Sequence, residues 1–154
     1  MPRKPTKPDA DADVLVFRAS LAPKLYREFE IGSASTLYDL ALAIVTVFDF
    51  DFDHAFGFYS NLKGSIYDSP VAYELFFDMG QADGKARSVK RTRAADAFAK
   101  IGHKMRFLFD YGDGWEFLVE FKKRQPKAPG VKLPRVVLSM GQAPEQYPSE
   151  EDED

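Results

Sequence analysis

Apolar and polar residues alternate most regularly between residues 103 and 121. The apolar members of this pattern are Met105, Phe107, Phe109 and Tyr111 and, further along, Phe117, Val119 and Phe121. Successive side chains of a strand point to opposite faces, so the pattern predicts two strands, each with an apolar face and a solvent-exposed face. Gly112 and Gly114 separate the strands, and glycine adopts the positive φ angles of tight hairpin turns without strain. We therefore predict an antiparallel hairpin with its aromatic rows on one buried face.

The first third of the chain carries equally readable patterns. Residues 14–21 and 25–31 are strand candidates joined by a short loop with a proline, and residues 54–59 form a third strand candidate. Thr36 and Asp39 have the spacing of a helix capping box. Apolar residues then follow the 3.6-residue helical period at Leu37, Leu40, Ala41, Ile44, Val47 and Phe48. This helix is expected to pack on the sheet.

The middle and the end of the chain give weaker patterns. Residues 73–79 are a further strand candidate, residues 80–85 are loop-like, and residues 131–138 are expected to return to the sheet edge. Thr92 is expected to cap a short helix that ends at Gly102. Its inward residues would be Ala95, Phe98, Ala99 and Ile101. Together these elements predict an α+β fold: an antiparallel or mixed sheet packed against one main helix plus a short second helix, in an order similar to a β-grasp-like roll.

Length and composition predict one domain with two tails. The chain has 154 residues, no cysteine and a net charge of -3. We expect a disordered arm over residues 1–13, a single domain over residues 14–148 and an acidic disordered tail over residues 149–154. The absence of cysteine excludes disulfides and thiolate sites. No apolar run approaches the roughly 20 residues of a membrane span, so no membrane contact is predicted and a cytoplasmic location is expected.

The run from Phe48 to His54 partly matches a calcium-binding loop. Asp49, Asp51 and Asp53 have the opening spacing of such a loop. His54 stands where the loop needs glycine, and Ser60 stands where it needs a bidentate glutamate. The favoured interpretation is a helix end with buried phenylalanines and aspartates in water.

A cluster of carboxylates around the hairpin turn could bind a divalent metal. The candidate ligands are Asp110, Asp113 and Glu116, with Asp53 and His54 from another strand. The favoured alternative is turn architecture, in which the two aspartates accept turn amides, Trp115 closes the core edge and Glu116 faces water. His54 is then a hydrogen-bonded, partly buried histidine. No metal site, cofactor or catalytic residue is predicted.

Basic residues offer two further binding candidates. Arg27 could bind an anionic ligand with its planar guanidinium, although an internal pair with Asp110 or Glu116 is favoured. The densest basic run contains Lys85, Arg87, Lys90, Arg91 and Arg93. Such a run could neutralise nucleic-acid phosphates, but no aromatic residues for base stacking are interleaved with it. The favoured interpretation is a solvated loop.

The run FDYGDGW, from Phe109 to Trp115, resembles the hallmark of the plasmid pRiA4b ORF-3-like family, also known through MM3350-like proteins. The pair Tyr26-Arg27, the helix from Thr36, the run 53–56 and the closing segment 141–145 resemble family positions in the same order. The resemblance covers about residues 14–148. It implies a largely uncharacterised domain that occurs near plasmids and mobile elements.

The sequence departs from this family at a possible metal site. Relatives commonly carry a second histidine where this chain has Phe56, and their closing segment often contains cysteines. A shared histidine–cysteine metal site is therefore not expected here. A recombinase label, sometimes given to relatives, is not supported, because no nucleophilic serine or tyrosine stands within an arginine set.

We therefore predict a non-enzymatic binding or accessory module with a protein or nucleic-acid partner in a plasmid or mobile-element context. The alternative is a divalent-metal-dependent hydrolase or nuclease that uses Asp110, Asp113 and Glu116 with His54.

Overall fold

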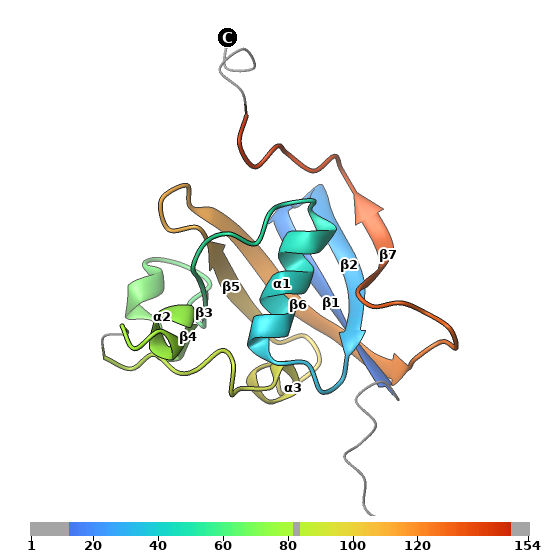
Figure 1. Cartoon of the computed structure of the whole chain (residues 1–154), viewed down its shortest axis with the longest axis horizontal. Coiled ribbons are helices and arrows are strands. Elements are labelled where there is room, and N and C mark those ends of the chain that lie inside the picture. The colour runs from blue at the N-terminus through green and yellow to red at the C-terminus, as the bar shows by residue number, and fades with distance from the viewer. Residues whose placement is uncertain (1–12, 82–83, 149–154) are drawn as a thin grey trace, which may run out of the picture.

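A computed structural model describes residues 13–81 and 84–148 of the chain. Seven strands form one antiparallel sheet in the order β4-β3-β5-β6-β1-β2-β7, and the main helix α1 lies across one face (Figure 1). The strands are β1 (Asp13–Ala22), β2 (Leu25–Gly32), β3 (Phe56–Tyr59), β4 (Ala72–Glu74), β5 (Lys104–Phe109), β6 (Trp115–Pro126) and β7 (Arg135–Met140). The helices are α1 (Leu37–Val47), α2 (Leu75–Asp78), α3 (Ala94–Ala97) and the 3-10 turn η1 (Ile66–Asp68).

This architecture confirms the predicted α+β class. The sheet is antiparallel in every described pairing rather than mixed. The predicted arm and acidic tail lie outside the described residues, except for Asp13, which begins β1. No described helix has the length and apolarity needed to cross a bilayer.

The β5–β6 hairpin follows the predicted register. Phe107 lies opposite Phe117, and Met105 lies opposite Val119. All four side chains are buried on the face that α1 covers, together with aromatic rings of β1, β2 and β3. Burial of this aromatic layer supplies the main hydrophobic contribution to the fold.

Helix α1 begins at the predicted capping box. Thr36 Oγ1 accepts a hydrogen bond from Asp39 N at 3.1 Å, and the Asp39 carboxylate accepts one from Thr36 N at 2.9 Å. Leu40 and Ile44 are fully buried on the sheet. The Phe48 ring follows the helix and packs against Phe117, with the centroids 5.0 Å apart.

The predicted strand over residues 73–79 is wrong beyond Glu74. Only Ala72–Glu74 pair with β3, and the chain then turns into α2. This turn brings Asp78 to the following segment, where its carboxylate accepts hydrogen bonds from Ser88 Oγ at 2.5 Å and from Val89 N at 2.9 Å. A tertiary contact therefore determines the secondary structure of this segment, although its local pattern favoured a strand.

The short helix α3 also differs from its prediction. Thr92 does not cap it, because the Thr92 hydroxyl donates to Ser88 O at 2.6 Å, and Arg93 takes the N-cap position without a side-chain bond. The helix ends at Ala97, so the helical period does not continue to Ile101, which is 68% exposed. Ala99 is exposed for the same reason.

The chain returns to the sheet edge as predicted, although as Arg135–Met140 rather than over residues 131–138. This last strand, β7, pairs with β2 at the edge of the sheet (Figure 1). All six of its residues are exposed.

Candidate functional site

The turn between β5 and β6 is organised by a buried aspartate. Asp110 is 5% exposed, and its Oδ1 accepts hydrogen bonds from Gly112 N at 3.1 Å and Asp113 N at 3.2 Å. Asp110 has a φ of 66° and Gly114 a φ of 71°. The expectation that both glycines supply positive φ is therefore wrong, because Asp110 takes the first left-handed position, which an aspartate tolerates when its side chain bonds to turn amides.

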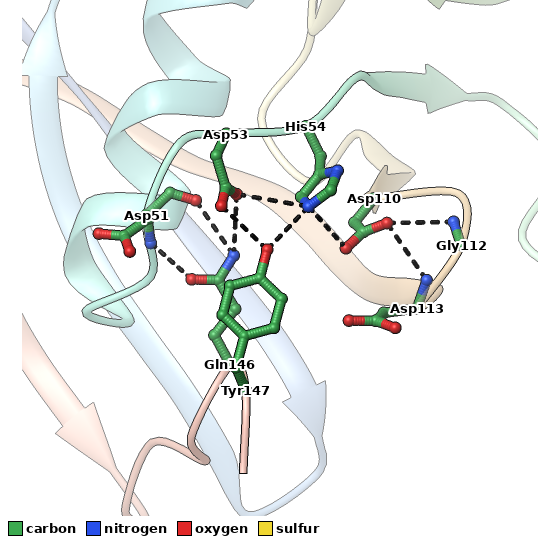
Figure 2. A network of polar contacts seen from close by, with 8 residues as sticks. All are labelled: Asp51, Asp53, His54, Asp110, Gly112, Asp113, Gln146 and Tyr147. Atoms are coloured by element: carbon green, nitrogen blue, oxygen red, sulfur yellow. Dashed lines mark hydrogen bonds and ion pairs between the residues drawn. The ribbon is translucent and has the colours of Figure 1, made fainter. Parts of the chain in front are cut away.

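The other oxygen of Asp110 faces His54, as Figure 2 shows. Asp110 Oδ2 lies 3.3 Å from His54 Nε2, and the same nitrogen lies 2.7 Å from Tyr147 Oη. The Tyr147 hydroxyl donates its only hydrogen to Asp53 Oδ2 at 2.9 Å. It must then accept from His54, which places a proton on Nε2.

Gln146, the residue before Tyr147, also joins the closing segment to the loop before β3. Its Oε1 accepts from Asp51 N at 2.6 Å, and its Nε2 donates to Asp51 O at 3.1 Å and to Asp53 Oδ1 at 3.3 Å. We call Asp51, Asp53, His54, Asp110, Gln146 and Tyr147 the C-terminal clasp. It joins the loop before β3, the β5–β6 turn and the end of the described chain (Figure 2).

Electrostatics in the clasp keep Tyr147 protonated. Desolvation, the hydrogen bond to Asp53 and the nearby charges of Asp53, Asp110 and Asp113 raise the pKa of Tyr147 to about 12. The aspartates of the preceding loop are exposed, while Phe48 and Phe50 are buried. This arrangement matches the helix-end interpretation rather than a calcium loop. His54 is hydrogen-bonded as expected, but its side chain is 41% exposed.

Three of the five candidate metal ligands lie together in the clasp, because His54 Nε2 is 3.3 Å from Asp110 Oδ2 and 3.7 Å from Asp53 Oδ1, but Glu116 does not join them. Glu116 lies on the sheet face opposite α1, where its Oε1 accepts from Arg106 Nη1 at 3.0 Å. Asp110 instead serves the turn and the clasp. Within residues 13–81 and 84–148, no three histidine, aspartate or glutamate side chains are grouped to hold a metal ion. Trp115 packs its ring on Phe50 at 4.8 Å, at the margin of the core.

Arg27 does not form the predicted pair with Asp110 or Glu116. Its Nη1 donates to Tyr26 O at 2.9 Å and to Met140 O at 3.1 Å, and its guanidinium lies 5.1 Å from the centre of the Phe48 ring. The residue is 9% exposed. Arg27 therefore ties β7 to β2 and has little access to an external anion.

The basic run is exposed on a firmly held backbone. We call residues 85–93 the basic segment. Leu37 N donates to Thr92 O at 2.9 Å and Tyr38 N donates to Val89 O at 3.1 Å, so the segment crosses the start of α1. Its five basic side chains are exposed, and none forms a salt bridge with another residue of the described chain. These residues are Lys85, Arg87, Lys90, Arg91 and Arg93.

A second polar cluster lies on the sheet face opposite α1, and sequence analysis missed it. The left-handed Asp110 breaks the alternation, so Tyr111 lies on this face instead of the predicted buried face. Its Oη is 2.6 Å from Tyr59 Oη, and the Tyr59 hydroxyl donates to the Glu74 carboxylate. Burial raises the pKa of both tyrosines above the ordinary range. The only sequence signal was Tyr59 in an alternating run.

The chain matches the family described as plasmid pRiA4b ORF-3-like protein over residues 14–148, and it belongs to that family. It is similar in fold to the crystal structure of MM3350, a protein of unknown function from Methanosarcina mazei Go1. That match has a TM-score of 0.64 and 21% sequence identity, and it covers 86% of this chain and 71% of the other. No curated protein matches the chain.

Proposed function

We propose that this protein is a non-enzymatic binding module whose basic segment contacts the phosphate backbone of a nucleic acid. The supporting observation is that most cations of the strands have a carboxylate partner, whereas none of the five cations of the basic segment has one among the described residues. Five sheet cations are paired with carboxylates: Arg18 with Glu28, Arg106 with Glu116, Lys122 with Glu120, Arg124 with Asp13 and Arg135 with Glu30. The basic segment keeps its positive charges for an external partner.

The chemistry of the segment favours the backbone over the bases. Lysine and arginine bind phosphate oxygens without reading sequence. The Tyr38 ring packs against the segment, with its centre already 5.1 Å from the Lys90 ammonium. Binding is therefore expected to be tolerant of sequence, as suits an accessory protein of plasmids or mobile elements.

A metal-dependent hydrolase finds less support in the geometry. Such an enzyme needs its carboxylates in one concave site. Glu116 and Asp110 are committed to different partners on different sides of the sheet. The binding module is accordingly the function that we propose.

Fluorescence anisotropy with a short labelled DNA duplex, a single strand and an RNA at rising salt tests this function. Replacing Arg91→Glu and Arg93→Glu together should weaken binding at least about tenfold at low salt and reduce the salt slope by about 2, since each lost phosphate contact contributes about 0.9. The matched control is Lys104→Glu with Lys123→Glu, which makes the same charge change at exposed positions outside the segment. Equal losses in both variants, or no binding by the unaltered chain, would reject the proposal.

A further inference from the structure

A hollow of about 580 Å³ lies beside β4, between the end of β3, the turn η1 and residues 84–86. We call it the β4 hollow. Its lining contains two carboxylates, two tyrosine rings and a set of apolar side chains. The members that matter here are Tyr59, Ile66, Tyr67, Asp68, Pro70 and Glu74. The clasp and the sheet salt bridges use none of them.

Glu74 is the lining carboxylate whose orientation is fixed by a hydrogen bond. It is half-buried, and one carboxylate oxygen, Oε2, accepts the hydroxyl of Tyr59, which fixes its orientation. No described residue donates a hydrogen bond to its Oε1, and no described cation pairs with it. A carboxylate that is held in one orientation and keeps one oxygen without a described donor can accept charge-assisted hydrogen bonds from a bound cation.

The tyrosine rings and the apolar lining of the hollow indicate which kind of cation fits it. Tyr67 is 71% exposed and stands edge-on to Tyr59, with the centroids 6.2 Å apart. A planar guanidinium stacks on such rings and forms paired hydrogen bonds to a carboxylate. Ile66 and Pro70 offer apolar surface for a methylene stem behind the charged head.

We infer that the β4 hollow binds an arginine side chain presented by a protein partner. Glu74 accepts the guanidinium, Tyr67 covers one of its faces, and Asp68 adds a second negative charge. Lys85 also lines the hollow, but two carboxylates outweigh its single positive charge. The inference goes beyond nucleic-acid binding and uses different side chains from Arg91 and Arg93, so each can fail without the other.

An NMR titration of the full chain with Nα-acetyl-arginine amide tests this inference. The backbone amides of residues 66–74 should shift in a saturable way. Nα-acetyl-citrulline amide has nearly the same shape without the charge, and it should bind at least about tenfold more weakly. Equal shifts from the two probes, or shifts that do not saturate, would overturn the inference.

Two variants test where the arginine probe binds, and one further probe tests whether the site prefers a guanidinium to an ammonium group. Glu74→Gln should weaken the arginine probe at least about tenfold, and Tyr67→Ala should weaken it severalfold. Tyr67 is largely exposed, so this second variant keeps the fold. Glu145→Gln, at an exposed carboxylate elsewhere, should change nothing. Unchanged affinity in Glu74→Gln would reject the site, and equal affinity for Nα-acetyl-lysine amide would reject a guanidinium-specific site.

Discussion

The C-terminal clasp and the β4 hollow both place carboxylates beside tyrosine hydroxyls, but they use them differently. In the clasp, Asp110 accepts two turn amides and faces His54, and Asp53 accepts from Tyr147 and Gln146. In the hollow, Glu74 accepts one hydroxyl and has no described cationic partner. Internal partners mark the clasp as architecture, whereas the binding site that we infer in the hollow contains a carboxylate without a described counter-charge.

The same contrast explains why we do not place the proposed function at the β5–β6 turn. Its polar groups hold the hairpin and the closing segment in place. Residues that could act on a partner lie instead in the segment between β3 and α3, where the local pattern was weakest. Connecting segments held by a rigid scaffold commonly carry binding residues.

The largest expected effect comes from removing Asp110. Asp110→Ala loses two charge-assisted hydrogen bonds and puts alanine at a φ of 66°, so unfolding should become easier by about 3 kcal/mol. Urea denaturation measures the change. Asp113→Ala removes an exposed neighbouring carboxylate and should cost less than about 0.5 kcal/mol. Similar losses from the two variants would mean that the turn does not depend on the buried carboxylate.

Gly57→Ala should have the next largest effect, and it acts on the hollow. A Cβ at this position would lie 2.8 Å from the hydroxyl oxygens of both Tyr59 and Tyr111. Overpacking of this kind costs about 2 kcal/mol, and it should also displace Tyr59 from Glu74. Thermal unfolding and the arginine titration report the two consequences separately.

Tyr111→Phe is the matched background for this variant. It removes one of the two crowded oxygens and should recover part of the stability that Gly57→Ala loses. No recovery would show that Tyr59 alone sets the space above Gly57.

The sequence was sufficient where local rules decide the structure. The capping box at Thr36 and the Phe107–Phe117 register follow from neighbours a few residues apart, and both are confirmed. Prediction from the sequence failed where one backbone angle or a distant contact determines the structure. The positive φ of Asp110 moved Tyr111 to the other face, and the contact of Asp78 with Ser88 replaced a strand by α2.

The candidate site was predictable only in part for the same reason. The role of Asp110 in the turn follows from its place before two glycines. Its contact with His54 and the contacts of Gln146 and Tyr147 with residues 51–54 join positions far apart in the chain, and no periodicity reports such pairs. Arg27 was misassigned because β7, which supplies the Met140 carbonyl, lies more than a hundred residues later.

The smallest expected effect is a pH-dependent loosening of the clasp. The pKa of Tyr147 is raised to about 12, compared with 10.0 for an ordinary tyrosine. Because the folded-state value is the higher one, the contribution of Tyr147 to stability is complete below about pH 10 and is lost as the pH rises toward 12. Tyr147 is half-exposed, so the loss should be slight and confined to the closing segment.

Hydrogen exchange at the Asp51 amide, which donates to Gln146 Oε1 in the clasp, followed between pH 9 and pH 12 against Tyr147→Phe, measures this loosening. The unaltered chain should lose protection relative to the variant as the pH rises, because phenylalanine has no proton to lose. Ultraviolet absorbance reports the ionisation of tyrosine side chains as the pH rises. The ionisation step with the highest pKa in the accessible pH range should be absent from the Tyr147→Phe variant. A parallel loss of protection in both chains would assign the change to another group and leave Tyr147 as a neutral contact.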